Sequence, residues 1–160
     1  MFRINYNQKG FTLVEMLVTM TIISILAGAA IPLARISVKR QKEIELRRNL
    51  RLIRQAIDEY KLLADEEKIE IERDSEGYPP DLETLVEGVE VTEEKEGEEI
   101  VRIVKFLRRI PKDPMTESYD WGLRSYQDDY DSTSWGGENV YDVYTRSLAT
   151  ALDGTRYQEW

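Results

Sequence analysis

The chain has 160 residues, of which 41% are hydrophobic and 33% charged, and its formal net charge at pH 7 is -9. It contains neither cysteine nor histidine, which excludes disulfide bonds, thiol nucleophiles, Cys/His zinc sites and imidazole acid–base chemistry. Only scattered carboxylates would remain for catalysis, so we do not expect an enzyme. Because the first third of the chain reads as one helix, the length leaves room for a single small globular head.

The first predicted element is an apolar helix from Phe11 to Ala34, whose one charged residue is Glu15. At about 1.5 Å per residue this segment is roughly 36 Å long, which is enough to cross a hydrocarbon core about 30 Å thick. A carboxylate in such a helix costs about 2.5 to 3.5 kcal/mol at the bilayer centre and less near its edge. We therefore expect Glu15 to require a partner, although it could also reach the headgroups or pair with an unrelated membrane helix.

Residues 1–10 precede this helix and carry Arg3 and Lys9 but no acid, which favours a cytoplasmic position for them. The basic residues that follow the apolar segment, between Arg35 and Lys42, oppose this orientation. An ordinary secretory signal is the alternative, with Ala27-Gly28-Ala29 as its small-residue cleavage site and a soluble binding domain that begins near Ala30. The long apolar run and its internal acid favour a retained membrane helix.

Residues 35–65 are predicted to continue the same helix as an amphipathic segment. Apolar residues recur there at alternating steps of four and three: Leu46, Leu50, Ile53, Ile57, Tyr60 and Ala64. This single stripe predicts packing against a sheet rather than a coiled coil. The opposite face carries Arg47, Arg48, Arg51, Arg54 and Glu43, and is either solvated or a contact surface for adjacent subunits.

Residues 66–160 are predicted to form the head. Asp81 is expected to cap a short helix through Val86 that stops at Gly88. Residues 93–99 are too charged for a core, and we expect them in a solvated loop or hairpin tip.

The remaining elements of the head are predicted to be strands. The apolar positions of residues 100–110 suit a helix, whereas their β-branched content suits a strand. Residues 121–127 and 140–145 alternate as strands do. An antiparallel sheet of two to four strands on a long helix follows, which is an α+β fold.

The segment GFTLVEMLVTMTIISILAGAAIPL, which begins at Gly10, resembles the class III signal of type IV pilins and type II secretion pseudopilins. The resemblance implies that prepilin peptidase cuts after Gly10, where a glycine lets the backbone extend, and that Phe11 becomes the methylated first residue. It also implies that Glu15 meets the Phe11 amine of a neighbouring subunit in a filament, and that Pro32 weakens the helix.

Phrases in the head are similar to those of the major pseudopilin of type II secretion systems. They are Tyr78-Pro79, Ile110-Pro111-Lys112-Asp113-Pro114, Trp121-Gly122, Tyr141-Asp142-Val143-Tyr144 and Asp153-Gly154 with Trp160. The resemblance implies a structural subunit of a homo-oligomeric helical filament that drives protein secretion, with a type IV or competence pilin as the alternative. The implied partners are prepilin peptidase, an inner-membrane assembly platform and minor pseudopilins. The implied location is the bacterial inner membrane, spanned once, with a cytoplasmic leader and a periplasmic head.

No cofactor is required by these features, but the resemblance implies a calcium ion in the loop after the last strand. Calcium takes about six or more oxygens, usually with two or more carboxylates. Within Ser147 to Tyr157 the single carboxylate is Asp153, so the loop either holds calcium or is a closing turn made by Asp153-Gly154. A denser acid group, Asp128, Asp129 and Asp131, lacks the glycine and distal glutamate of an EF-hand and is expected in an exposed turn.

Two further features bear on binding. Nucleic acid is not an expected partner, because the acidic head would repel phosphate. The aromatic residues of the predicted strands are expected in the sheet core: Tyr119, Trp121, Tyr126, Tyr141 and Tyr144.

Overall fold

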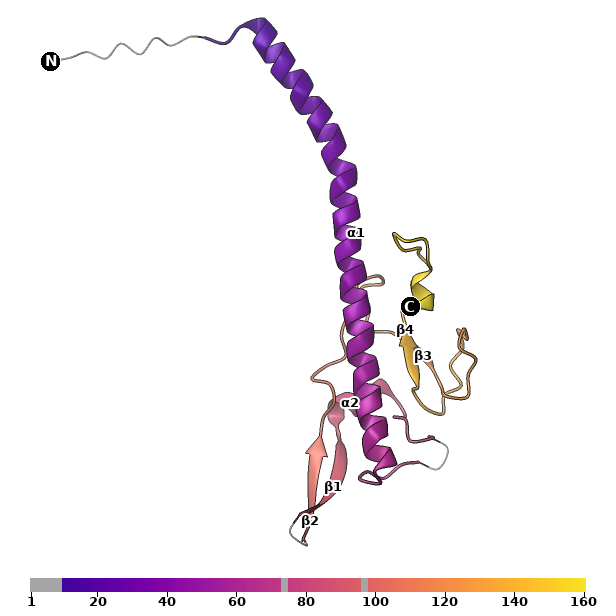
Figure 1. Ribbon diagram of the computed structural model, residues 1–160. Coiled ribbons are helices and arrows are strands. Elements are labelled where there is room, and N and C mark those ends of the chain that lie inside the picture. Colours follow the sequence, from indigo (N-terminus) through magenta and orange to yellow (C-terminus); the bar gives the residue numbers. More distant parts are fainter. Residues whose placement is uncertain (1–9, 73–74, 96–97) are drawn as a thin grey trace, which may run out of the picture. The chain divides into compact units, whose positions relative to one another are not determined.

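The computed structural model describes residues 10–72, 75–95 and 98–160 (Figure 1). Its elements in chain order are α1 (Leu13–Asp65), α2 (Leu82–Glu87), β1 (Val89–Lys95), β2 (Glu98–Val104), β3 (Gly122–Arg124), β4 (Asp142–Tyr144) and the 3-10 helix η1 (Tyr157–Glu159). The chain divides into two compact units, the first ending at Lys39 and the second comprising Arg40–Trp160. One long helix with small antiparallel sheets is the predicted α+β fold.

Helix α1 ends at Asp65, where the sequence predicted its end. Glu67 takes a left-handed conformation with φ 55°, and its N–H donates to the Ala64 carbonyl at 3.0 Å. The N–H of Lys68 donates to the Leu63 carbonyl, also at 3.0 Å. These bonds satisfy carbonyls of the last turn that have no partner within the helix, which is how a left-handed residue terminates a helix.

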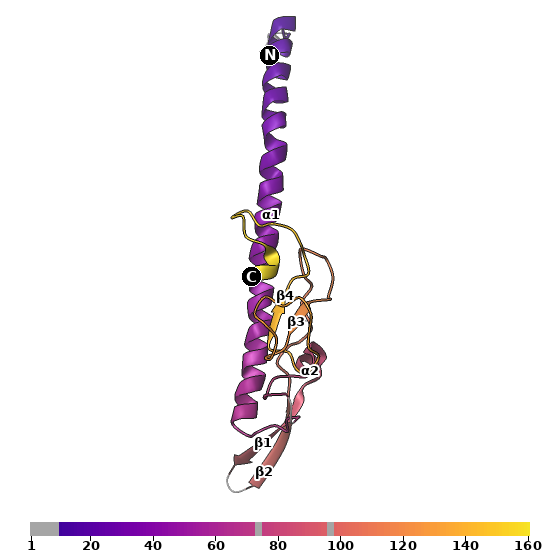
Figure 2. The same ribbon diagram turned by 90° about the vertical axis from the view of Figure 1, so that its right-hand side faces the viewer.

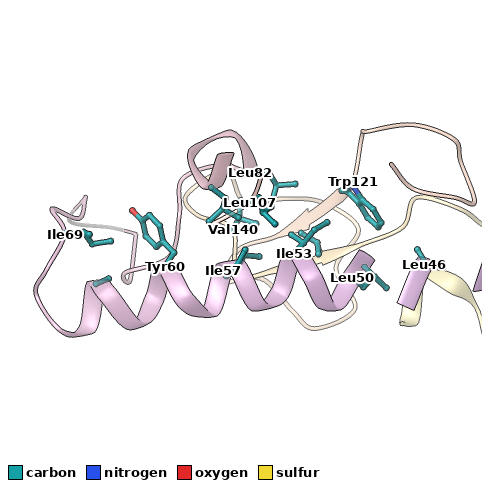
Figure 3. Packing of buried hydrophobic residues seen from close by; sticks show 14 of the residues in the cluster. Leu46, Leu50, Ile53, Ile57, Tyr60, Ile69, Leu82, Leu107, Trp121 and Val140 are labelled. Carbon is teal, nitrogen blue, oxygen red and sulfur yellow. The ribbon is translucent and has the colours of Figure 1, made fainter. Parts of the chain in front are cut away.

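The core of the second unit is built on the predicted apolar stripe of α1 (Figure 3). All six stripe residues are at most 6% exposed: Leu46, Leu50, Ile53, Ile57, Tyr60 and Ala64. Buried residues from the rest of the unit pack against them, among them Leu85, Val91, Trp121, Val140, Val143 and Tyr157. The four–three spacing of the stripe therefore located the core correctly.

Helix α2 has the predicted caps. The Asp81 carboxylate accepts a hydrogen bond from the Thr84 N–H at 2.7 Å, and the Gly88 N–H donates to the Thr84 carbonyl at 2.9 Å. Gly88 has φ 89°, and a Cβ there would lie 2.6 Å from the Val104 carbonyl oxygen. Glycine is thus required at this position both by the backbone conformation and by the close approach of β2.

The ambiguous segment 100–110 begins as a strand. β1 and β2 form an antiparallel hairpin whose register runs from Val89 opposite Val104 to Lys95 opposite Glu98. Residues 93–95 and 98–99 lie in these strands, whereas residues 96–97 of the expected solvated loop or hairpin tip lie outside the described residues. After β2 the chain leaves the strand, and the N–H groups of Phe106 and Leu107 both donate to the Leu85 carbonyl.

Strands β3 and β4 are shorter than predicted, at three residues each, and pair only with each other. The described strands therefore form two separate two-stranded sheets rather than one. Figures 1 and 2 show that β3 and β4 lie alongside α1, whereas the β1–β2 hairpin extends past the end of α1 at Asp65.

Candidate functional site

Glu15 lies in the first turn of α1 and takes part in its N-terminal cap. Its N–H donates to the Thr12 hydroxyl oxygen at 3.2 Å. Threonine at the cap followed by glutamate three residues later is the spacing of a capping box, so Glu15 has a local structural role as well as its charge. Its side chain is exposed, and within residues 10–72, 75–95 and 98–160 its carboxylate has neither a hydrogen bond nor an ion pair.

The apolar segment forms an exposed sheath around this part of α1. The exposed large apolar residues are Phe11, Leu13, Val14, Met16, Leu17, Val18, Met20, Ile22, Ile23, Ile25, Leu26, Ile31 and Leu33. Of the helices that the structure describes, α1 is the one long and apolar enough to cross a membrane, with a mean hydropathy of 2.1 in its most apolar window. Such a surface needs an apolar environment.

The hydroxyl groups within the sheath have partners inside the helix. Thr19 donates to the Met16 carbonyl at 3.0 Å, Thr21 to the Leu17 carbonyl at 2.7 Å, and Ser24 to the Met20 carbonyl at 2.8 Å. Hydrocarbon offers no hydrogen-bond partner, so polar groups must be satisfied within the protein. This segment meets that condition and leaves Glu15 as the one charged group of residues 11–34.

Gly10 and Pro32 bracket the segment. A Cβ at Gly10 would have no atom within 4 Å, so the described contacts give no packing reason for a glycine there. Helix α1 continues through Pro32, which cannot donate to the Gly28 carbonyl and so removes one bond of the helix. The expected weak point is therefore present as a missing hydrogen bond, although the helix is unbroken there. Gly10, Phe11, Glu15 and Pro32 all belong to the first unit.

Asp153 belongs to the second unit and is engaged in a turn. Its Oδ1 accepts from the Thr155 N–H at 3.0 Å and from the Thr155 hydroxyl at 2.6 Å, while its Oδ2 lies 3.4 Å from Nη2 of Arg47. The hydroxyl bond first, and then the backbone bond, hold the pKa of Asp153 below its usual value. Gly154 follows with φ 90°, as a tight turn requires.

The oxygen atoms of Asp153 are not placed as calcium ligands. Both oxygens of Asp153 already face hydrogen-bond donors, and Arg47 brings a positive charge to the same place. No group of three or more acidic, histidine or cysteine residues that could hold a metal occurs in the described ranges. The closing turn accounts for the geometry of this loop, and we derive no role for a metal in it.

An arginine network that no sequence pattern indicated connects α1 with β4 and Trp160 in the second unit. Arg54 Nε lies 2.6 Å from Asp142 Oδ1, and its Nη2 donates to the Val143 carbonyl at 3.1 Å and to the Trp160 carbonyl oxygen at 2.8 Å. The buried Arg124 approaches the same carboxylate at 3.4 Å. The arginine face of α1 is therefore neither wholly solvated nor wholly available to other subunits.

Two acids for which the sequence indicated no partner also organise the head. Glu43 Oε1 accepts from the Tyr157 hydroxyl and from the Leu152 N–H, both at 2.8 Å. Burial first, and then this hydrogen bond, raise the pKa of Tyr157 to about 12. Asp113 is fully buried and accepts from the Met115 N–H at 2.8 Å and the Thr145 hydroxyl at 2.5 Å. In the sequence, Asp113 stood out only as part of the phrase from Ile110 to Pro114 that is similar to the major pseudopilin.

The expectation for the aromatic residues is wrong in part. Trp121 and Tyr144 are buried as predicted, but three others are exposed: Tyr119 at 63%, Tyr126 at 56% and Tyr141 at 47%. The strands are too short to include these three residues, so their side chains do not point into a sheet core. Tyr126 and Tyr141 pack instead with Tyr78 at ring-centroid distances of 5.2 to 5.7 Å.

The predicted acid turn is present. Asp128 Oδ2 accepts from the N–H groups of Ser125 at 2.7 Å and Gly136 at 3.1 Å, which closes the loop between β3 and β4. These backbone bonds hold the pKa of Asp128 below its usual value. Asp129 and Asp131 are exposed beside it.

Comparison with protein families gives one match, in which the prokaryotic N-terminal methylation motif covers residues 5–31. Comparisons with curated proteins and with solved structures found no match. The matched segment contains Gly10, Phe11 and Glu15 and most of the apolar sheath. It indicates a type IV pilin-like prepilin, and the exposed apolar helix is consistent with anchoring in a membrane.

Proposed function

We propose that this type IV pilin-like chain is the structural subunit of a pseudopilus that drives protein secretion through a type II secretion-like system. Prepilin peptidase cuts it between Gly10 and Phe11 and methylates the new N-terminus. The mature subunit then assembles through its N-terminal helix into a homo-oligomeric filament. Minor pseudopilins and an inner-membrane assembly platform are its further partners, and its head faces the periplasm.

One observation carries this proposal: Glu15, four residues after Phe11, is the single carboxylate of the exposed and otherwise apolar segment 11–34. Cleavage leaves a cationic amine on Phe11, which in lipid is as costly as the carboxylate. Pairing the two in neighbouring copies buries both charges together, whereas burying either alone leaves it uncompensated. Each copy contributes one amine and one acid, so the pairing can continue from copy to copy without closing.

The second support is the apolar sheath that surrounds these two residues. Its threonine and serine hydroxyls are satisfied inside the helix, so the side chains that face outward can pack on lipid or on copies of the same helix. Small residues such as Ala27 and Gly28 let neighbouring helices approach closely. A filament core made of these helices would replace lipid around the sheath.

Substitution of Glu15 by glutamine tests the proposal and separates its two roles. Glutamine at this position keeps the bond from the backbone N–H to the Thr12 hydroxyl oxygen but removes the charge. We expect Glu15→Gln to be cleaved and methylated normally, and filaments recovered by shearing and seen by electron microscopy to fall at least ten-fold.

Thr12→Ala is the matched control. It removes the capping oxygen, at a cost of about 1 kcal/mol to the helix, and keeps the charge of Glu15. Filaments are expected from this variant. Wild-type filament levels from Glu15→Gln would refute the pairing of this acid with the neighbouring amine.

A further inference from the structure

A groove of about 650 Å³ lies between α1 and the segment that follows β2. One wall is formed by α1 from Glu45 to Leu52, and the other by residues 106–112, with Tyr119 at its border. The Asn49 side-chain amide donates to the Lys112 carbonyl at 2.9 Å, and Phe106 and Leu107 are bonded to Leu85. Both walls are therefore held in place, and the groove exists without a ligand.

The groove is basic in a protein whose net charge is negative. Its lining holds Arg48, Arg108, Arg109 and Lys112 against the single acid Glu45. All four are exposed, and none has an ion pair within the described ranges of the chain. Apolar surface lies among them, since Leu52 is 46% and Tyr119 63% exposed. The chemistry suits a partner that presents carboxylates beside apolar side chains.

The β1–β2 hairpin of the same chain offers such a surface. Residues 89–99 contain six glutamates and one lysine. Arg102 of β2 pairs with Glu93 at 2.6 Å, and in sequence residues 89–104 carry six acids against the two bases Lys95 and Arg102. On one face of the hairpin, Val101 is 58% and Ile103 66% exposed.

The hairpin cannot fill the groove of its own copy. The groove begins at Phe106, next to the base of the hairpin, whereas the seven-residue strands run about 20 Å away from that base. Figures 1 and 2 show that β1 and β2 extend past the end of α1. The far ends of these strands cannot reach the groove of their own copy, but they can reach the groove of another.

We propose that the basic groove between α1 and residues 106–112 binds the acidic β1–β2 hairpin of a second copy of this chain. This contact rests on the proposed filament, in which it would join the heads of successive copies along the filament axis. Because the two surfaces differ, the contact is heterologous and leaves a groove free on one copy and a hairpin free on the other. Repetition therefore extends the filament and does not close a dimer.

A charge exchange tests this contact in the full-length chain expressed with prepilin peptidase. Arg108→Glu/Arg109→Glu reverses the charge of these two groove residues, and Glu94→Lys/Glu99→Lys reverses the charge of two hairpin residues. Each double variant is expected to lower filament yield at least ten-fold. The quadruple variant, which restores both the complementarity and the net charge of -9, is expected to recover filaments.

The matched control is Asp129→Lys/Asp131→Lys, which changes the net charge as much as the hairpin variant but in another exposed loop. It should assemble normally. Wild-type filament levels from either double variant, or failure of the quadruple variant to recover them, would overturn the contact. Failure to recover would point to an acidic partner other than this chain.

Cross-linking gives a second measurement that does not depend on how stable the charge variants are. The chain has no cysteine, so Arg109→Cys in one copy and Glu94→Cys in another create the only thiols. A disulfide-linked dimer in wild-type-like filaments supports the contact, and its absence contradicts it. Cleavage after Gly10 is measured in every sample. If the unsubstituted chain is neither cleaved nor assembled into filaments, the proposed function is refuted, whereas a defect confined to the variants concerns the head contact.

Discussion

Arg54 connects α1 with two parts of the second unit that are distant from it in sequence, namely β4 and Trp160. It contacts the side chain of Asp142, the carbonyl of Val143 and the carbonyl oxygen of Trp160 from one position on α1. A planar guanidinium can bind several oxygens at once, which a lysine ammonium cannot do with the same geometry. Asp142 is half-buried, so removal of its partner would leave a desolvated carboxylate.

We therefore predict that Arg54→Ala lowers the free energy of unfolding by about 2 kcal/mol, the usual contribution of hydrogen bonds to charged groups. Arg54→Lys should recover part of this loss. Arg51→Ala is the control, because Arg51 is exposed on the same helix and, among the residues that the structure describes, its side chain bonds to the Arg47 carbonyl alone. Denaturant unfolding of the full chain in detergent measures the three variants, and equal stability of Arg54→Ala and Arg51→Ala would contradict the role of Arg54.

Because of Tyr157, we predict that the free energy of unfolding depends on pH in the alkaline range. Its pKa is about 12 in the folded chain, against about 10 for an unfolded tyrosine, because the fold buries the phenol and bonds it to Glu43. Between these values the unfolded state binds fewer protons than the folded state, so stability falls as pH rises. The stabilisation is complete below about pH 10 and is lost by about pH 12.

The Tyr157→Phe variant isolates this effect from the other groups that titrate in the same range, among them Tyr60 and Tyr78, whose pKa values burial also raises. We expect the variant to be less stable at neutral pH and to lose less stability than the wild type between about pH 10 and pH 12. Unfolding midpoints measured across this range test the difference. Parallel curves for the two proteins would show that Tyr157 does not cause the loss of stability over this pH range.

At this scale the sequence predicted burial better than polar contacts. Leu46, Leu50 and Ile53 could be placed in the core because their spacing alone puts them on one helix face. Arg54 and Asp142 are 88 residues apart, and only the tertiary fold brings them together. No local spacing rule connects such a pair.

Strand β3 depends on a close approach to its partner β4. Gly122 lies opposite Tyr144 in the register, and a Cβ at Gly122 would overlap the Tyr144 ring. The Arg124 guanidinium also lies over the Tyr144 ring, 4.2 Å from its centre. The ring is therefore confined and cannot simply move away.

We predict that Gly122→Ala destabilises the fold by about 1 to 3 kcal/mol, the usual cost of overpacking. The cost should shrink when Tyr144 is replaced by leucine in the same chain, because the ring that the new methyl group meets is gone. A double-mutant cycle measured by thermal unfolding compares the two backgrounds. Additive effects of the two substitutions would contradict the proposed clash.

Local signals predicted some elements and not others. Asp81 and Gly88 fixed α2 because both caps are encoded within a few residues. The segment 100–110 stayed ambiguous because its apolar pattern suits both a helix and a strand, and pairing with β1 decided in favour of a strand over Glu98–Val104. The lengths of β3 and β4, and hence the exposure of Tyr126 and Tyr141, depend on pairing that no short pattern encodes.

For the whole molecule, the chain combines a sheath that needs an apolar environment with a folded acidic head. The N-terminal motif was recognisable in the sequence because Gly10, Phe11 and Glu15 fall within a few consecutive residues. The basic groove was not, since Arg48 and Arg108 belong to segments that only folding brings together. The proposed site of processing is thus a local property of the sequence, whereas the proposed head contact is a property of the fold.

Cleavage after Gly10 and retention of the membrane helix are tested by the mass of the N-terminal peptide of the mature chain, purified from membranes of cells that contain prepilin peptidase. We expect a peptide that begins at Phe11 and carries one methyl group on its amine. A mature chain that begins near Ala30, without the sheath and without Glu15, would contradict both the membrane helix and the filament built on it.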